Sequence, residues 1–291
     1  MLRRIVKENQ QLFINSKEVV GIQDINFNYN LPIEQIRYLG MESVIFANNG
    51  PVLAEMNISK LMIDLDDFIQ LTGDNTFSGH LQYKDKYFGF NSGILDNYNI
   101  SCSINELVTL DARFSMLGDF GSGIQKNDNI YSKNPYKILN YSDIEISLND
   151  FQFNRLQSFN MTVDNARNII YKLGNSYPEQ IISNSPVEVN LSFSIKADEY
   201  QVKNIRNLIC NYDVNSLNII FKQFEDPFGS SVLTYSFNEI LFLGESYSAN
   251  IDGSVDVNLN YKAFKQPNLN ISKRQTLPAE DTINRINTIS F

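Results

Sequence analysis

Residues 21–40 read GIQDINFNYNLPIEQIRYLG, and residues 155–174 read RLQSFNMTVDNARNIIYKLG. A shift of 134 positions aligns Gln23 with Gln157 and Gly40 with Gly174, and it places apolar residues on apolar residues. Few residues are identical, but order, spacing and alternation agree over the whole stretch. The repeat predicts that the chain contains two copies of one β-rich unit.

The repeat extends in both directions from this stretch. Upstream, residues 14–19 match residues 148–153 at the same shift. Downstream, PVLAEMNIS at 51–59 matches PVEVNLSFS at 186–194. Late in each half, VTLDARF at 108–114 resembles VNLNYKA at 257–263, a shift of 149. The two copies are therefore expected to cover most of the chain.

Length and composition agree with two domains. The chain has 291 residues, and its 43% hydrophobic content with 20 Phe and 15 Tyr can fill two cores. The expected divisions are a first domain at 1–117, a linker at 118–140, a second domain at 141–264 and a C-terminal arm at 265–291. The linker is expected because the stretch has several glycines and no periodicity. The arm has two prolines and no core pattern, so we expect it to become ordered only against a neighbouring molecule.

Most of the chain alternates apolar and polar residues, as strands of an antiparallel sheet do when one face is buried. Matched parity across the repeat predicts one inward-facing set in each copy. The set comprises Ile25, Phe27, Val52 and Met56 in the first copy, and Phe159, Met161, Val187 and Leu191 in the second.

One helix is expected in each copy. In the second copy it begins near Asp198, and Val202, Ile205, Leu208 and Ile209 recur at helical spacing. In the first copy the corresponding stretch is 66–71, which ends before Gly73. The predicted fold class is mainly β, with two tandem antiparallel β-sandwich or barrel domains that each carry one short α-helix.

The sequence offers little catalytic chemistry, and we predict that the protein is not an enzyme. His80 is the only histidine and is expected at the surface or at a sheet edge; alone it cannot form a two-histidine metal site. Asp64, Asp66 and Asp67 lack calcium-loop spacing and fit a charged helix start. Cys102 and Cys210 are expected to be small buried side chains. No catalytic, cofactor-binding or metal-binding residues are predicted, although distant paired carboxylates stay open.

Charge and hydropathy limit the partners. The formal net charge is −9, from 33 acidic and 24 basic residues, which disfavours gripping nucleic acid because Lys and Arg drive phosphate binding. No segment reaches the roughly 18 apolar residues of a membrane helix, and the N-terminus lacks an apolar run of signal-peptide length. We therefore expect a soluble protein that is intracellular when it is made.

The order of elements resembles the tail-tube family of bacteriophage tails and contractile injection systems. A strand pair ending in Leu-Gly is followed by an alternating strand after a proline and then by a short amphipathic helix. These positions are 25–40, 51–58 and 66–71 in the first copy, and 159–174, 186–195 and 198–209 in the second. The resemblance implies a virion structural protein without cofactors, assembled in the host bacterial cytoplasm. Its rings would stack into a tube through which DNA passes without specific binding.

The resemblance leaves several alternatives open. Three chains giving six domains per ring are favoured over six chains with one domain each at the lumen. Sheath, baseplate or neck proteins are further partners, and both contractile and non-contractile tails stay open. The protein could instead form a single ring as a tube initiator or adaptor at the baseplate or neck. A less favoured alternative is an unrelated carbohydrate-binding double β-sandwich, or a glycan-cleaving enzyme on that scaffold, although the chain has no Trp.

Overall fold

The computed structural model describes residues 10–30, 33–36, 40, 46–49, 53–63, 68–72, 76–84, 86–124, 138–149, 151–153, 155–173, 178–183, 186–197, 215–222, 231–249, 255–265 and 267–271.

The described residues form strands and short 3-10 turns, which confirms the mainly β fold class. The first half contains β1 (Gln10–Ile14), β2 (Lys17–Val19), β3 (Ile22–Asn30), β4 (Ile33–Ile36), β5 (Phe46–Asn49), β6 (Leu53–Leu61), η2 (Ile69–Thr72), β7 (Phe77–Tyr83), β8 (Lys86–Ser103), β9 (Thr109–Met116) and β10 (Phe120–Ser122). The second half contains η3 (Tyr141–Asp143), β11 (Ile144–Leu148), β12 (Phe151–Gln152), β13 (Leu156–Asp164), β14 (Arg167–Tyr171), β15 (Pro178–Ser183), β16 (Glu188–Ala197), β17 (Asn215–Lys222), β18 (Ser231–Ala249), β19 (Val255–Ala263) and β20 (Asn268–Ile271).

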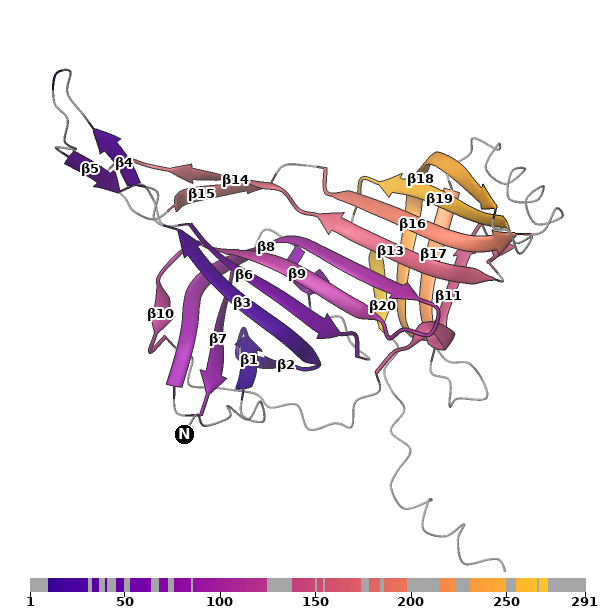
Figure 1. Ribbon diagram of the computed structural model, residues 1–291, viewed down its shortest axis with the longest axis horizontal. Coiled ribbons are helices and arrows are strands. Elements are labelled where there is room, and N and C mark those ends of the chain that lie inside the picture. The colour runs from indigo at the N-terminus through magenta and orange to yellow at the C-terminus, as the bar shows by residue number, and fades with distance from the viewer. Residues whose placement is uncertain are drawn as a thin grey trace, which may run out of the picture.

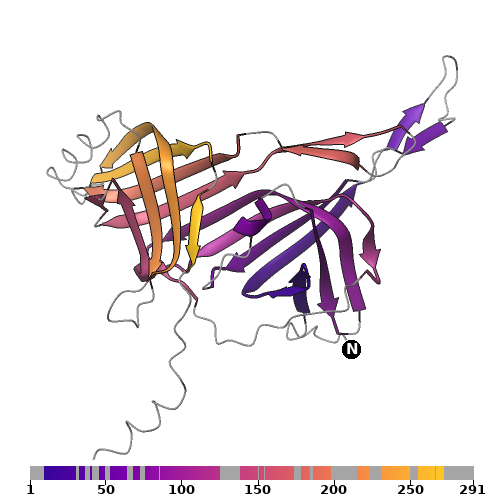
Figure 2. The same ribbon diagram turned by 180° about the vertical axis from the view of Figure 1, so that it is seen from behind.

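The strands of the two halves join into one antiparallel sheet, seen from opposite sides in Figures 1 and 2. Within the first half the strands follow the order β3-β6-β9-β8, and β8 also pairs with β7, which leads to β1 and β2. The second half repeats this order as β13-β16-β19-β18, with β17, β11 and β12 in the places of β7, β1 and β2. The hairpins β4–β5 and β14–β15 are separate two-stranded sheets that extend beyond the main sheet (Figure 1).

A single long strand in each half takes part in two layers. The early part of β8 pairs with β7, and its later part pairs with β9. Side chains from both layers meet in the core: the Phe77 ring on β7 lies 5.2 Å from the Phe114 ring on β9 and 5.6 Å from that of Phe90. In the second half Phe221 on β17 similarly faces Phe159 on β13 at 6.2 Å. Most of the buried apolar residues of both halves belong to one continuous hydrophobic cluster.

The register of the strands is also the same in the two halves. Met56 pairs with Phe114 between β6 and β9, and Leu191 pairs with Tyr261 between β16 and β19. The pairing between β3 and β6 is interrupted between Ile22 and Asp24, and that between β13 and β16 is interrupted between Leu156 and Ser158. Adding 134 to the first pair of positions gives the second pair. A slip of one residue would turn every side chain to the other face of the sheet. The two halves therefore agree both in strand order and in which side chains face the core.

Two further irregularities recur at matched places. The interruption between Phe77 and Gly79 on β7 has a counterpart between Asn215 and Leu217 on β17. The interruption between Leu95 and Asn97 on β8 has a counterpart between Phe242 and Gly244 on β18, 147 positions later. Bulges bend and twist a strand locally, so both long strands bend at equivalent points.

The tight turns carry the same hydrogen bonds. Asn15, at φ 49°, donates its backbone N–H to the carbonyl of Ser78 at 2.8 Å, and its side-chain oxygen accepts from the Ser78 N–H at 3.2 Å. Asn149, at φ 46°, makes both bonds with Ser216, at 2.9 and 2.8 Å. Asparagine tolerates the left-handed conformation and bonds the neighbouring backbone, which explains its presence at both turns.

Most of the predicted inward-facing set is confirmed. Met56, Phe159, Met161 and Leu191 are buried, and Ile25, Phe27 and Val187 are half-buried against the core. Val52 lies outside the described residues.

The predicted alignment of 108–114 with 257–263, at a shift of 149 positions, is wrong. The observed registers place Leu110 at the position of Val257 and Phe114 at that of Tyr261, a shift of 147. The error is a slip of two residues, which preserves which side chains face inward, so alternation alone could not reveal it.

The predicted helix of the first copy is wrong in type, because its described part is a single 3-10 turn at Ile69–Thr72. The apolar residues Phe68 and Ile69 are buried there, so one turn is enough to cover the core. Asp66 and Asp67, and the second-copy helix from residue 198 onward, lie outside the described residues.

The stretches predicted as linker and arm both contain paired residues. β10 lies within 118–140 and pairs with β8, and Ile138 forms an isolated bridge with Ile63. β20 lies within 265–291 and pairs with β18. Strands of three or four residues are too short to show a clear alternation. The rest of the arm, from residue 272, lies outside the described residues.

Candidate assembly interface

The two halves meet edge to edge where β13 pairs antiparallel with the later part of β8. The pairing runs from Ser158 opposite Ser103 to Asp164 opposite Asn97. Backbone hydrogen bonds extend it at both ends, from Ile104 to the Gln157 carbonyl at 2.9 Å and from Asn165 to the Asp96 carbonyl at 2.8 Å. We call this pairing the internal seam. Figure 1 shows it as the place where β8 and β13 lie side by side.

One face of the internal seam belongs to the hydrophobic core. Tyr98 and Ile100 of β8 are fully buried, and so are Met161 and Val163 of β13. The register places Ile100 opposite Met161 and Tyr98 opposite Val163. Cross-strand apolar pairs of this kind stabilise a sheet, so the halves are joined by packing as well as by backbone hydrogen bonds.

A buried amide fastens the end of the internal seam. The Asn165 side chain is 3% exposed, and its Nδ2 donates to the carbonyls of Thr72 and Leu95 at 3.0 Å each. Arg167 also donates to the Thr72 carbonyl at 3.3 Å. Thr72 and Leu95 lie in the first half and Asn165 lies in the second, so this contact holds the halves together. Nothing in the sequence analysis indicated Asn165, because an isolated asparagine in an Asn-rich chain gives no signal.

Replacing Asn165 with alanine is expected to lower the free energy of unfolding by about 2–4 kcal/mol, because two carbonyls would lose a buried donor. Urea denaturation followed by circular dichroism measures the change. Asn168→Ala, at an exposed position of the adjoining hairpin, is the matched control and should change stability by less than about 0.5 kcal/mol. Equal effects of the two variants would contradict this role for Asn165.

Each side of the internal seam has a counterpart in the other half of the chain. These counterparts have a described strand on one side only. On β3 these are residues 24–30, whose only described strand neighbour is β6. On β18 they are residues 244–249, whose only described strand neighbour is β19. We call these two stretches the β3 edge and the β18 edge. Open strand edges expose backbone groups that can pair with another strand.

Both edges expose apolar side chains whose counterparts in the internal seam are buried. Tyr29 of the β3 edge is 62% exposed, whereas its counterpart Val163 is 0% exposed. Tyr247 of the β18 edge is 48% exposed, whereas its counterpart Ile100 is 0% exposed. Just before the β18 edge, Leu241 is 56% exposed while its counterpart Ile94 is 1% exposed. Apolar residues are therefore present at both edges, but no strand of the described part of the chain covers them there.

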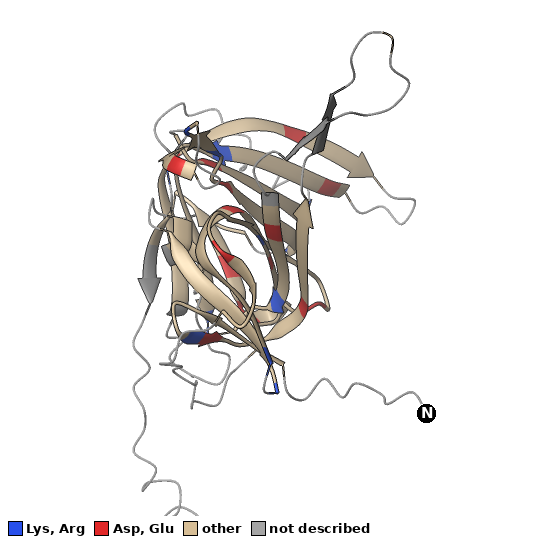
Figure 3. Ribbon diagram, turned by 90° about the vertical axis from the view of Figure 1, so that its left-hand side faces the viewer, with Lys and Arg blue, Asp and Glu red and all other residues tan. Residues whose placement is uncertain are grey.

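The opposite face of the joined sheet is polar. Along β13 and β16 it presents small uncharged residues such as Asn160, Thr162 and Ser192, and Thr162 Oγ1 donates to Asn99 Oδ1 across the internal seam at 3.0 Å. Acidic residues outnumber basic ones on this face, and Figure 3 shows both kinds scattered along the strands. The acidic residues are Asp24, Glu55, Asp96, Asp111, Asp164, Glu188 and Asp256, and the basic ones are Arg113, Lys196 and Lys262.

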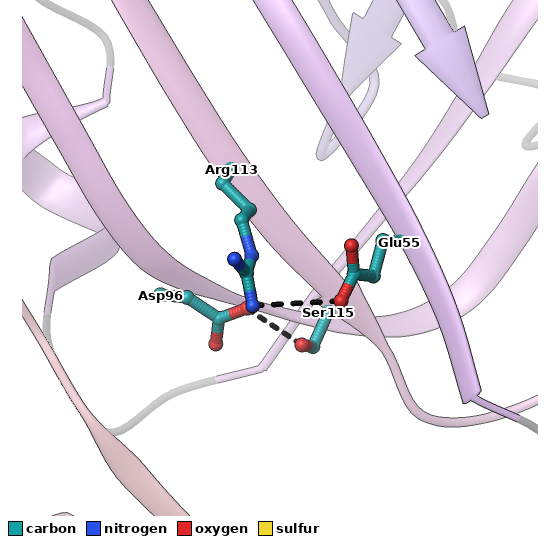
Figure 4. A network of polar contacts seen from close by, with 4 residues as sticks. All are labelled: Glu55, Asp96, Arg113 and Ser115. Carbon is teal, nitrogen blue, oxygen red and sulfur yellow. Dashed lines mark hydrogen bonds and ion pairs between the residues drawn. The ribbon is translucent and has the colours of Figure 1, made fainter. Parts of the chain in front are cut away.

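Charges on this face lie close to one another. Arg113 forms an ion pair with Glu55 at 3.4 Å, and Ser115 donates to Asp96 at 2.6 Å, as Figure 4 shows. Burial raises the pKa of Asp96, although the Ser115 hydroxyl and the Arg113 charge oppose the shift. Lys262 pairs with Glu188 at 2.8 Å. Two of the three basic side chains on this face, Arg113 and Lys262, are therefore engaged with carboxylates, which limits the positive charge offered to a phosphate backbone.

The prediction that His80 lies at the surface or at a sheet edge is wrong. His80 is buried, with only 2% of its surface exposed. His80 lies opposite Phe13 in the β1–β7 pairing, and their rings stack with centres 5.0 Å apart. The Tyr87 ring contacts His80 edge-on, with ring centres 5.9 Å apart. Nε2 is buried and has no hydrogen-bond partner within the described part of the chain. The position was misjudged because β1 and β7 also bury side chains on the face away from the main core.

Stability should fall below neutral pH because of His80. Burial lowers its pKa below the ordinary 6.5, so the unfolded chain binds a proton more readily than the folded chain. The contribution of neutral His80 to the free energy of unfolding is then fully present above pH 6.5. It is lost as the pH falls, by at most about 1.4 kcal/mol per pH unit. Urea unfolding at pH 7.5 and 5.5 measures this loss, which should be smaller in His80→Gln. An equal loss in both proteins would show that His80 is not its source.

The remaining candidate groups form no reactive cluster where the structure can be described. Cys102 is buried as predicted, at 5% exposure, and burial raises the pKa of its thiol to about 11. Cys210 and the acidic cluster Asp64, Asp66 and Asp67 lie outside the described residues. Within the described ranges no group of His, Cys, Asp and Glu side chains could hold a metal ion, and no helix is long and apolar enough to cross a membrane.

No family model matches the chain, and no curated protein matches its sequence.

Proposed function

We propose that this protein is a virion structural protein that forms rings of a bacteriophage tail tube by joining β-sheets edge to edge. The observation that carries the proposal is the internal seam, where two halves of the same strand order already share one continuous sheet. The β3 and β18 edges match the two sides of that seam, so further copies can be added in the same manner.

We further infer that the halves are two copies of one domain. Matching strand order, registers, bulges and turn hydrogen bonds support this inference, because unrelated β-sandwiches share architecture without sharing such details. The bulge found 134 positions after the first one is one of these shared details.

Three chains per ring are favoured over six. A ring of three chains would contain six quasi-equivalent domains, with internal seams alternating with seams between chains. In the six-chain alternative, one domain of each chain would line the lumen and the other would decorate the outside. The internal seam supports three chains, because both halves already belong to one sheet.

The polar face of the sheet is the proposed lining of the bore. Its uncharged Asn, Ser and Thr residues and its excess of carboxylates would let DNA pass without specific binding. The virion tail is the proposed location, after assembly in the host bacterial cytoplasm.

The purified protein should bind double-stranded DNA weakly, if at all, in fluorescence anisotropy at 50 mM salt. Tight, salt-sensitive binding would contradict a conduit role.

Size-exclusion chromatography with light scattering, followed by negative-stain microscopy, tests the proposal. The expected species is a ring of three 33.4 kDa chains, with stacked rings at high concentration. Single rings that never stack would favour an initiator or adaptor at the baseplate or neck. A protein that stays monomeric at every concentration would contradict ring formation.

A further inference from the structure

We propose a specific partner and register for the contact between chains: the β18 edge of one chain pairs antiparallel with the β3 edge of the next. Asn30 lies opposite Gly244, Asn28 opposite Ser246, and Asn26 opposite Ser248. This inference rests on the proposed ring function, but it makes a separate claim about which residues meet.

The register follows from two offsets that the structure supplies. β13 corresponds to β3 by an offset of 134, because Leu156 and Ser158 match Ile22 and Asp24. β18 corresponds to β8 by an offset of 147, because Phe242 and Gly244 match Leu95 and Asn97. The internal seam pairs Thr162 with Asn99. Subtracting 134 from 162 gives 28, and adding 147 to 99 gives 246.

The same offsets predict which side of β18 the next chain occupies. On β8, strand β7 pairs with residues 86–93 and β13 pairs with residues 97–103, whereas β9 and β10 pair with β8 at the other edge. On β18, β17 takes the place of β7, and β19 with β20 takes the places of β9 and β10. The next chain therefore adds beside residues 244–249, beyond Ile240, the last residue of β18 that pairs with β17.

Side chains fit this register on the core face. It places Tyr247 opposite Phe27, where the internal seam has Ile100 opposite Met161, and Ala249 opposite Ile25, where the internal seam has Cys102 opposite Phe159. Apolar residues thus meet apolar residues, and the exposed surface of Tyr247 gains a neighbour. A slip of one residue would instead bring Tyr247 beside an asparagine.

The third core-face pair offers a hydrogen-bond donor to a buried acceptor. Glu245 Oε2 is buried without a hydrogen-bond partner among the described residues, near the Tyr261 hydroxyl, which is also buried and unpaired there. Burial and the Glu245 charge both raise the pKa of Tyr261. The proposed register places Tyr29, which is 62% exposed, opposite Glu245. Its hydroxyl would be a donor for Glu245 Oε2, which has none among the described residues.

The polar face fits as well. The paired positions carry Asn30 with Gly244, Asn28 with Ser246, and Asn26 with Ser248, so no like charges oppose each other. The β3 and β18 edges differ from each other, so the contact is head-to-tail. Head-to-tail contacts build closed rings or open filaments rather than twofold dimers.

Cysteine pairs test the register directly. We would join Asn28→Cys with Ser246→Cys and compare Asn26→Cys or Asn30→Cys with the same Ser246→Cys, all under mild oxidation. A disulfide needs Cβ atoms about 3.5–4.5 Å apart, and positions two residues out of register lie farther than that. The positive control is Asn99→Cys with Thr162→Cys, whose side chains touch at 3.0 Å inside one chain. Linked peptides are identified by mass spectrometry, which distinguishes them from Cys102 and Cys210.

The expected result is a chain-to-chain disulfide in the 28/246 pair, at least fivefold more abundant than in the 26/246 and 30/246 pairs. Rings in which another pair dominates, or in which none of the three pairs links, would overturn the register while leaving the proposed function standing. A protein that stays monomeric and links only through the internal control pair would overturn both.

Discussion

Replacing Tyr247 with aspartate is expected to abolish ring assembly while leaving the free chain folded. Tyr247 is 48% exposed, so the free chain can hydrate a carboxylate at this position. In the proposed contact the same carboxylate would lie against Phe27, which packs on the core, and beside Glu245. Burying an unpaired charge costs about 3 kcal/mol or more per contact, so each contact should weaken by at least about 100-fold.

Light scattering and circular dichroism together measure this outcome. The matched control is Tyr141→Asp, because Tyr141 is 45% exposed and lies away from both edges, in η3. The control should still assemble. Rings of normal size from the Tyr247→Asp protein, or the same loss of assembly in the control, would contradict a role for the β18 edge.

The largest loss of stability is expected from Phe114→Ala. Phe114 is fully buried on β9, and its ring makes edge-on contacts with Phe68 at 5.3 Å and Phe77 at 5.2 Å. Removing this ring leaves a cavity between the two layers of the first half, and such substitutions cost about 3–5 kcal/mol. Because the hydrophobic cluster is continuous across both halves, the whole chain should unfold at lower denaturant.

Urea denaturation monitored by circular dichroism measures the midpoint. Phe264→Ala is the control, since Phe264 is 39% exposed and its loss should cost less than about 1 kcal/mol. A second, unshifted transition in the Phe114→Ala protein would show that the second half unfolds independently of the first. A loss no larger than that of the control would contradict the packing described for this core.

The fold class and much of the core could be predicted from alternation, because period two survives sequence divergence. Met56 and Leu191 are examples: both lie at inward positions of matched strands and both are buried. Alternation could not distinguish a slip of two residues, so the late strands were aligned at an offset of 149 rather than 147. It also failed at His80, because β7 buries residues on both of its faces.

The β3 and β18 edges could be predicted only in outline. The repeat implied that two copies would need to meet, but neither the strands at the internal seam nor Asn165 carries a recognisable motif. Which strand lies at an edge depends on pairing between residues far apart in sequence, such as Thr162 with Asn99. Tyr29 has the same parity as Ile25 and Phe27, which pack against the core, and yet it is 62% exposed because β3 lies at an edge of the sheet.

The most direct test is a reconstruction of the assembled ring by electron cryo-microscopy without imposed symmetry. The expected map has threefold symmetry, with six similar domains per ring and one unbroken sheet in which internal seams alternate with β18–β3 contacts. The polar face of that sheet should line the bore. A ring with true sixfold symmetry, in which each chain places only one of its halves at the lumen, would contradict this account.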